Sequence, residues 1–155
     1  MIHLYWMYYK LNFQKMIKIY SKIQEGLLLH IIFRFNEFEK INDRMHIIED
    51  NNFLQCSALF MNTGRTFKPH RHRFKEATTI STIAQEAWVV FKGKVKCTFY
   101  DINDKKLIDI ELHEGDSSFT LFGGHTYLIL EDNTKVFEFK TGPYHGQEND
   151  KVFID

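Results

Sequence analysis

Two histidines separated by one residue are the feature of this chain that is best suited to chemistry. His70 and His72 flank Arg71, and on a β-strand, side chains two positions apart project to the same face. Two imidazoles about 7 Å apart along one face can close on a single metal ion. Such a pair also arises by chance, in which case the histidines are ordinary surface residues.

A carboxylate and a third imidazole occur further along the chain, each in a strand-like setting. Alternation places Glu86 and Trp88 on one face of their strand. If that face is the interior, the buried carboxylate needs a cation or hydrogen-bond donors. His125 follows the pair Gly123 and Gly124, which lets the backbone bend tightly and approach its neighbours closely.

Short strands separated by turn residues must position these side chains. Aromatic residues are abundant, with fifteen Phe and seven Tyr, and they favour pleated sheets over helices. Pro69 lacks a ladder donor, so its strand must lie at an edge or a bulge. Turn signals at a spacing of roughly 8–12 residues predict an all-β sandwich or barrel. The expected strands are 17–20, 27–34, 53–62, 66–73, 77–92, 95–100, 107–112, 118–122, 125–130 and 136–140, with a short helix or a loop at 36–44.

The spacing of the glycines, histidines and glutamate resembles the two motifs of the cupin superfamily. In the first motif, five residues separate Gly64 from the pair at 70 and 72, and six separate Glu86 from Gly93. In the second, Gly115, Gly123 and His125 stand at the motif positions. The resemblance covers roughly residues 60–140. It implies a double-stranded β-helix, the cupin or jelly-roll barrel, with an irregular N-terminal extension.

The same resemblance implies that His70, His72, Glu86 and His125 bind one divalent metal ion. Glu76 is the alternative carboxylate, since it lies at the family's usual distance after the pair but lacks the following glycine. Three imidazoles and one carboxylate suit Fe, Mn, Zn, Ni or Co. An ion with open positions could polarise a carbonyl or activate a bound water.

Several residues around these candidates have expected supporting roles. Tyr127 shares the parity of His125, and we predict it as the catalytic acid, base or substrate anchor. The alternative is a core aromatic with a hydrogen-bonded hydroxyl. Trp88 and Tyr100 are further neighbours of the expected site, whereas Cys97 and His30 are predicted to be core residues.

Composition argues against several classes of partner. Lys plus Arg equals Asp plus Glu at 20 each, so no basic excess favours nucleic-acid binding. The longest apolar run falls short of the ~20 residues that cross a bilayer, so we expect no membrane span. Cys56 and Cys97 form no CxxC pair, and reduced core thiols favour a cytoplasmic location.

The two ends of the chain differ in character from the middle. Residues 1–15 are expected to be an N-terminal extension of a single domain at 16–155, whether translation starts at Met1 or Met16. A protein starting at Met16 should therefore melt at the temperature of the full chain, and a large loss would contradict this. The polar tail after Thr141 could fold back on the barrel through Val152, Phe153 and Ile154. The apolar N-terminal third predicts a homodimer.

Three functions are compatible with these expectations. The first is a metal-dependent isomerase or epimerase acting on a small polar metabolite such as a sugar or a keto acid, as in carbohydrate metabolism. The second is an iron-dependent dioxygenase, which would use the same four ligands. The third is a non-catalytic module that binds a small ligand. The sequence does not settle whether the protein is an enzyme.

Overall fold

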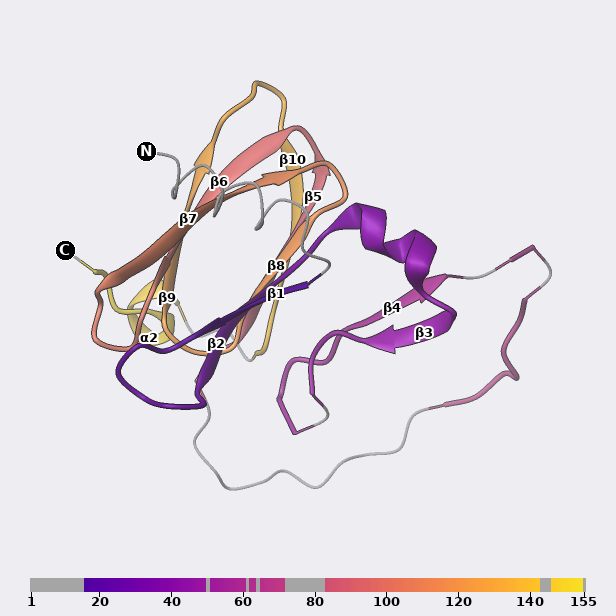
Figure 1. Cartoon of the computed structure of the whole chain (residues 1–155), viewed down its shortest axis with the longest axis horizontal. Coiled ribbons are helices and arrows are strands. Elements are labelled where there is room, and N and C mark those ends of the chain that lie inside the picture. Colours follow the sequence, from indigo (N-terminus) through magenta and orange to yellow (C-terminus); the bar gives the residue numbers. More distant parts are fainter. Residues whose placement is uncertain are drawn as a thin grey trace, which may run out of the picture.

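The protein folds as an all-β structure of antiparallel sheets (Figure 1). The computed structural model describes residues 16–49, 51–60, 62–63, 65–71, 83–142 and 146–154. The strands are β1 (Met16–Tyr20), β2 (Leu28–Phe33), β3 (Asp43–His46), β4 (Ser57–Phe60), β5 (Glu86–Lys92), β6 (Lys94–Tyr100), β7 (Lys106–His113), β8 (Ser117–Thr120), β9 (Gly124–Ile129) and β10 (Lys135–Lys140). A 3₁₀ helix, η1 (Phe35–Lys40), precedes β3, and a short helix, α2 (Gln147–Asp150), follows β10.

The larger sheet has five strands in the order β1-β2-β8-β5-β10. β8 lies at its centre, between β2 and β5, although the three strands are far apart in the chain. Five of the six residues of β2 are buried, including neighbours that point to opposite faces. A strand that is buried on both faces needs a cover on each side of its sheet.

The smaller sheet, in the order β7-β6-β9, supplies the cover on one side. Val95, Cys97 and Phe99 of β6 alternate along their strand and are all fully buried. They pack with Ile32 and Val90 of the larger sheet in one apolar cluster between the two sheets. The predicted alternation of β6 and the predicted core position of Cys97 are confirmed.

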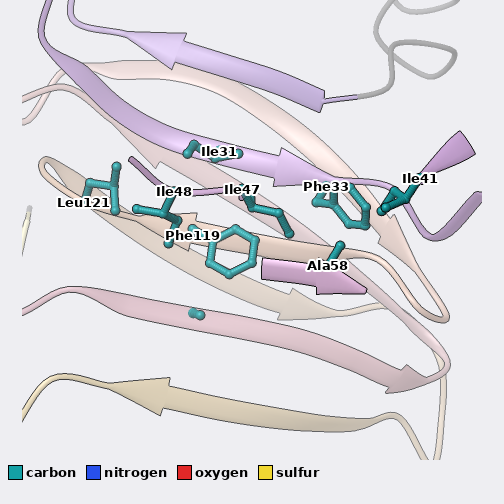
Figure 2. Close-up of a cluster of buried hydrophobic side chains, with 9 residues drawn as sticks. Ile31, Phe33, Ile41, Ile47, Ile48, Ala58, Phe119 and Leu121 are labelled. Atoms are coloured by element: carbon teal, nitrogen blue, oxygen red, sulfur yellow. The ribbon is translucent and has the colours of Figure 1, made fainter. Parts of the chain in front are cut away.

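The hairpin of β3 and β4, together with η1, covers part of the opposite face of the larger sheet (Figure 1). Figure 2 shows Ile31 and Phe33 of β2 and Phe119 of β8 meeting Ile47, Ile48 and Ala58 from this unit. The larger sheet is therefore the middle of three layers in this region. Neither β3 nor its pairing with β4 was predicted from the sequence.

A buried ion pair joins the end of β2 to the turn between β7 and β8. Arg34 Nη1 lies 2.6 Å from Asp116 Oδ2, and both side chains are less than a tenth exposed. Arg34 also donates to the Glu111 carbonyl at 2.8 Å. The Asp116 carboxylate accepts hydrogen bonds from the backbone N–H groups of Phe35 and His113. One carboxylate thus joins the end of β2 and the start of η1 to the turn between β7 and β8.

The structure corrects three predicted strands. Residues 65–71 have no strand conformation, although 66–73 was predicted to form one. Pro69 removes a ladder donor there, and the neighbouring lysine and arginine side chains contribute no apolar face to pair against a sheet. The strand predicted at 77–92 begins only at Glu86 within the part that is described. The strand predicted at 53–62 is shortened to Ser57–Phe60.

Two further predictions concern the N-terminal end of the chain and membranes. Residues 1–15 lie outside the described residues, so the predicted extension stays a prediction. Among the helices that the structure does describe, none is long and apolar enough to span a membrane.

Candidate functional site

A carboxylate and an imidazole from opposite sheets meet in the interior. Glu86 opens β5 of the larger sheet, and His125 is the second residue of β9 in the smaller sheet. His125 Nε2 lies 3.1 Å from Glu86 Oε1. The side chains of His125 and Glu86 are 22% and 13% exposed, so the pair is largely buried. The structure thus brings together two of the four predicted ligand residues.

The register of the strands explains why these two residues meet. Glu86 pairs with Thr120 of β8 on one side and with Lys140 of β10 on the other. Trp88, two residues further along β5, lies on the same face and stacks on Tyr127 of β9. Because His125 and Tyr127 share a face, the stack aligns β9 over β5 and places the imidazole over the carboxylate.

Charge stabilises the ionised form of this carboxylate. Burial by itself would raise the pKa of Glu86, because it disfavours the charged form. The hydrogen bond and charge of His125, with the charges of Lys151 and Lys140, outweigh burial and lower the pKa of Glu86. The carboxylate is therefore anionic at neutral pH and can accept a proton or a cation.

The second nitrogen of the His125 ring is an orphaned polar atom. Nδ1 is buried and has no hydrogen-bond partner among the described residues. If Nε2 donates to Glu86, a neutral ring leaves a lone pair on Nδ1, and a protonated ring leaves an N–H there without an acceptor. A buried acceptor without a donor costs about 1–3 kcal/mol, which a bound ligand or water could recover.

Two aromatic residues form a rigid wall beside the pair. The rings of Trp88 and Tyr127 stack with centroids 3.9 Å apart and planes 9° from parallel. The Tyr127 hydroxyl lies 3.1 Å from Ser118 Oγ, and Trp88 Nε1 donates to Glu138 at 3.2 Å. Burial raises the pKa of Tyr127 well above its ordinary value. Tyr127 is therefore a neutral hydrogen-bonding group, unsuited to act as a base.

A third imidazole lies on the same inner face, but both of its ring nitrogens already have hydrogen-bond partners. His30 is completely buried, with Nδ1 3.1 Å from Thr120 Oγ1 and Nε2 3.2 Å from the Tyr100 carbonyl. Burial, with a smaller effect from the charge of His125, lowers the pKa of His30 to about 4. The prediction of a satisfied core histidine is confirmed, and this neutral ring supports the strand that holds Thr120 beside Glu86.

The double glycine before His125 serves two separate purposes. Gly123 has a φ of +74°, and a Cβ there would lie 2.5 Å from the Tyr100 carbonyl oxygen. This conformation favours glycine, and the close approach of the backbone carbonyl leaves no room for a side chain. Gly124 has an ordinary backbone, but a Cβ there would lie 2.3 Å from Ile154 Cδ1. The tight bend and the close approach predicted at this corner are both present.

The other predicted ligands lie elsewhere or cannot be placed. His70 belongs to the segment 65–71, which lies beyond β3 and β4 and away from β5 and β9 (Figure 1). Its ring is exposed, with Nδ1 2.8 Å from the Lys68 carbonyl oxygen. His72 and the alternative carboxylate Glu76 lie outside the described residues. No group of three possible metal ligands occurs within the described part of the chain.

Comparisons with known proteins assign this chain to no family. No protein-family model, no curated protein and no solved structure matches this chain. The resemblance to cupins therefore rests on the motif residues alone, and any function has to be argued from the side chains described above.

Sequence reasoning overlooked the polar residues that flank the pair. Ser118 and Thr120 of β8 share one face, whereas Phe119 and Leu121 point into the outer cluster. This polar–apolar alternation in residues 118–121 was available as a signal, but four residues are too few to indicate which face is internal. Lys140 was overlooked because its position opposite Glu86 depends on long-range register.

Proposed function

We propose that this protein is a cupin-like barrel that binds a divalent metal ion at Glu86 and His125 and, through it, a small polar metabolite. The observation that carries the proposal is the 3.1 Å approach of Glu86 Oε1 to His125 Nε2 inside the barrel. The two residues come from strands of different sheets, and a cation explains why an ionised carboxylate is kept in a partly buried place.

The separation of the two atoms fits a shared ion as well as a hydrogen bond. Donor atoms that each lie about 2.1 Å from a metal ion, at a right angle to each other, are about 3 Å apart. Imidazole and carboxylate suit Mn, Fe, Co, Ni or Zn. Two donors alone hold such ions weakly, so further ligands are needed. The predicted pair His70 and His72 would supply them if the segment 65–71, on which His70 is exposed, moved toward Glu86 and His125 when the ion binds.

A bound ion would polarise a carbonyl or hydroxyl group of a sugar or keto acid. The chain's own residues have separate tasks. Glu86 is the anionic group that can accept a proton, and Trp88 provides a flat apolar wall against which a ring or chain can pack. The Tyr127 hydroxyl, held by Ser118, is placed to position Trp88 rather than to accept a proton.

Metal titration of purified variants tests the proposal. We expect Mn²⁺, Zn²⁺ or Ni²⁺ to bind the wild type in isothermal titration calorimetry after chelator treatment. Replacing one ligand, in Glu86→Gln or His125→Ala, should weaken binding at least about tenfold. His113→Ala, which removes an exposed imidazole at the end of β7, is the matched control and should leave binding unchanged.

The same titration decides whether the predicted histidine pair completes the site. Loss of affinity in both His70→Ala and His72→Ala would support the four-residue centre. Unchanged affinity in these variants, with loss in the Glu86 and His125 variants, would restrict the centre to the barrel interior. If no ion binds the wild type more tightly than His125→Ala, the metal proposal is wrong.

A metal-free binding module is a second candidate, favoured by the direct contact between Glu86 and His125. In this alternative the pair itself binds the polar group of a ligand, and the orphaned His125 Nδ1 accepts a hydrogen bond from it. Binding of a sugar or keto acid that persists in chelator but disappears in Glu86→Gln would establish this function and exclude the first.

A further inference from the structure

The C-terminal segment is attached at two places to the strands that carry the proposed site. Lys140 Nζ lies 2.5 Å from Asp150 Oδ2, and these side chains are only 18% and 12% exposed. Lys140 is the register partner of Glu86, so this ion pair lies next to the carboxylate of the site.

The second attachment is an apolar contact at the base of His125. Ile154 Cδ1 occupies the space above Gly124 where any side chain would otherwise stand. The neighbouring Val152 and Phe153 are 93% and 73% exposed. Of these three apolar residues, Ile154 is thus the one that packs against the barrel, as was predicted for the tail. Because a single methyl group at position 124 would occupy its place, this contact is narrow and easily disrupted.

The charge of the segment also reaches the site. Lys151 follows Asp150 directly, and its charge contributes to the lowered pKa of Glu86. The segment therefore adds one cation near the carboxylate, while Asp150 neutralises Lys140. An anionic or metal-bound ligand approaching Glu86 and His125 would meet both of these groups.

We infer that residues 146–154 form a removable cover over the Glu86–His125 pair, closed by the Asp150–Lys140 ion pair and by Ile154 on Gly124. A ligand reaches the pair when these two contacts open. The inference depends on the proposed function only in taking the pair as the ligand site. The opening itself is a property of the metal-free protein and can be measured without any ligand.

Chemical modification of the histidines tests the cover. Diethyl pyrocarbonate acylates accessible neutral imidazoles, and mass spectrometry of the peptides gives the rate at His125 relative to exposed His113 in the same molecule. Asp150→Asn removes one contact, and Gly124→Ala pushes Ile154 away. Each substitution should raise the relative modification rate at His125 about fivefold. This factor is the effect on the closed state of losing one partly exposed contact. Val152→Ser alters an exposed residue of the same segment and should leave the rate unchanged.

Buried His30 reports on folding in the same experiment. Its modification should stay slow in all variants, which shows that any gain at His125 comes from the tail and not from unfolding. An unchanged rate at His125 in both Asp150→Asn and Gly124→Ala, with His30 still protected, would overturn the cover. A faster rate at His125 in a protein that binds no metal would support the cover while rejecting the metal function.

Discussion

Replacing Asp116 by alanine should lower the free energy of unfolding by about 3–5 kcal/mol. The substitution leaves the Arg34 guanidinium buried without its carboxylate and removes the acceptor for the backbone N–H groups of Phe35 and His113. Breaking a buried pair from one side costs more than the pair contributes, because the remaining charge stays desolvated. Urea unfolding followed by circular dichroism measures the change.

Asp109→Ala is the matched control for this prediction. Asp109 also pairs with a cation, Lys106 at 2.7 Å, but both side chains are more than a third exposed. Its loss breaks this exposed ion pair and removes the acceptor of the Thr98 hydroxyl, so it should cost about 1–2 kcal/mol, clearly less than the loss of Asp116. Equal losses in the two alanine variants would mean that burial of the Arg34–Asp116 pair has no energetic consequence and that its place in the fold is incidental.

The protein should lose about 3 kcal/mol of stability through His30 alone as the pH falls from 6.5 to about 4. The folded state holds this ring neutral, with its pKa lowered to about 4, whereas the unfolded chain protonates it near 6.5. The unfolded state therefore binds the extra proton first. The contribution of His30 is complete above pH 6.5 and disappears on acidification through this window.

The variant His30→Gln isolates this contribution from the titration of carboxylates. Glutamine retains hydrogen-bonding groups but does not titrate. The unfolding free energy of His30→Gln should therefore fall less steeply than that of the wild type between pH 6.5 and 4. His113→Gln, at an exposed position, should keep the wild-type slope. Parallel curves for wild type and His30→Gln would show that folding does not lower the pKa of His30.

The second half of the fold could be predicted closely from local pattern. The expected strands 95–100, 107–112, 125–130 and 136–140 each lie within one or two residues of β6, β7, β9 and β10. Here polar and apolar residues alternate between clear turns, because each strand has one face toward the core. Alternation also predicted that Glu86 and Trp88 share one face of their strand, and the structure places both on the inner side.

The first half of the fold and the outer parts of the site could not be predicted in this way. β3 is short and mostly exposed, so Asp43, Arg44 and His46 show no alternation that would identify a strand. The pair His70 and His72 has the spacing of ligands, but spacing says nothing about whether a strand forms or which sheet it joins. The place of Lys140 beside Glu86 and of Ile154 over Gly124 depends on tertiary contacts alone.

The central position of β8 has a consequence for how the chain is made. β2 can pair with β1 as soon as both are made, but its other neighbour in the sheet, β8, comes much later, and the pair His30 and Thr120 is separated by ninety residues. At a translation rate of about 5–20 residues per second, β2 leaves the ribosome roughly 5–20 seconds before its partner. During that interval the edge of β2 has no β8 to pair with, and its apolar residues Ile31, Ile32 and Phe33 lack much of the core that buries them in the folded protein. We therefore expect the nascent chain to need chaperone protection, and expression at low temperature to increase the yield of folded protein.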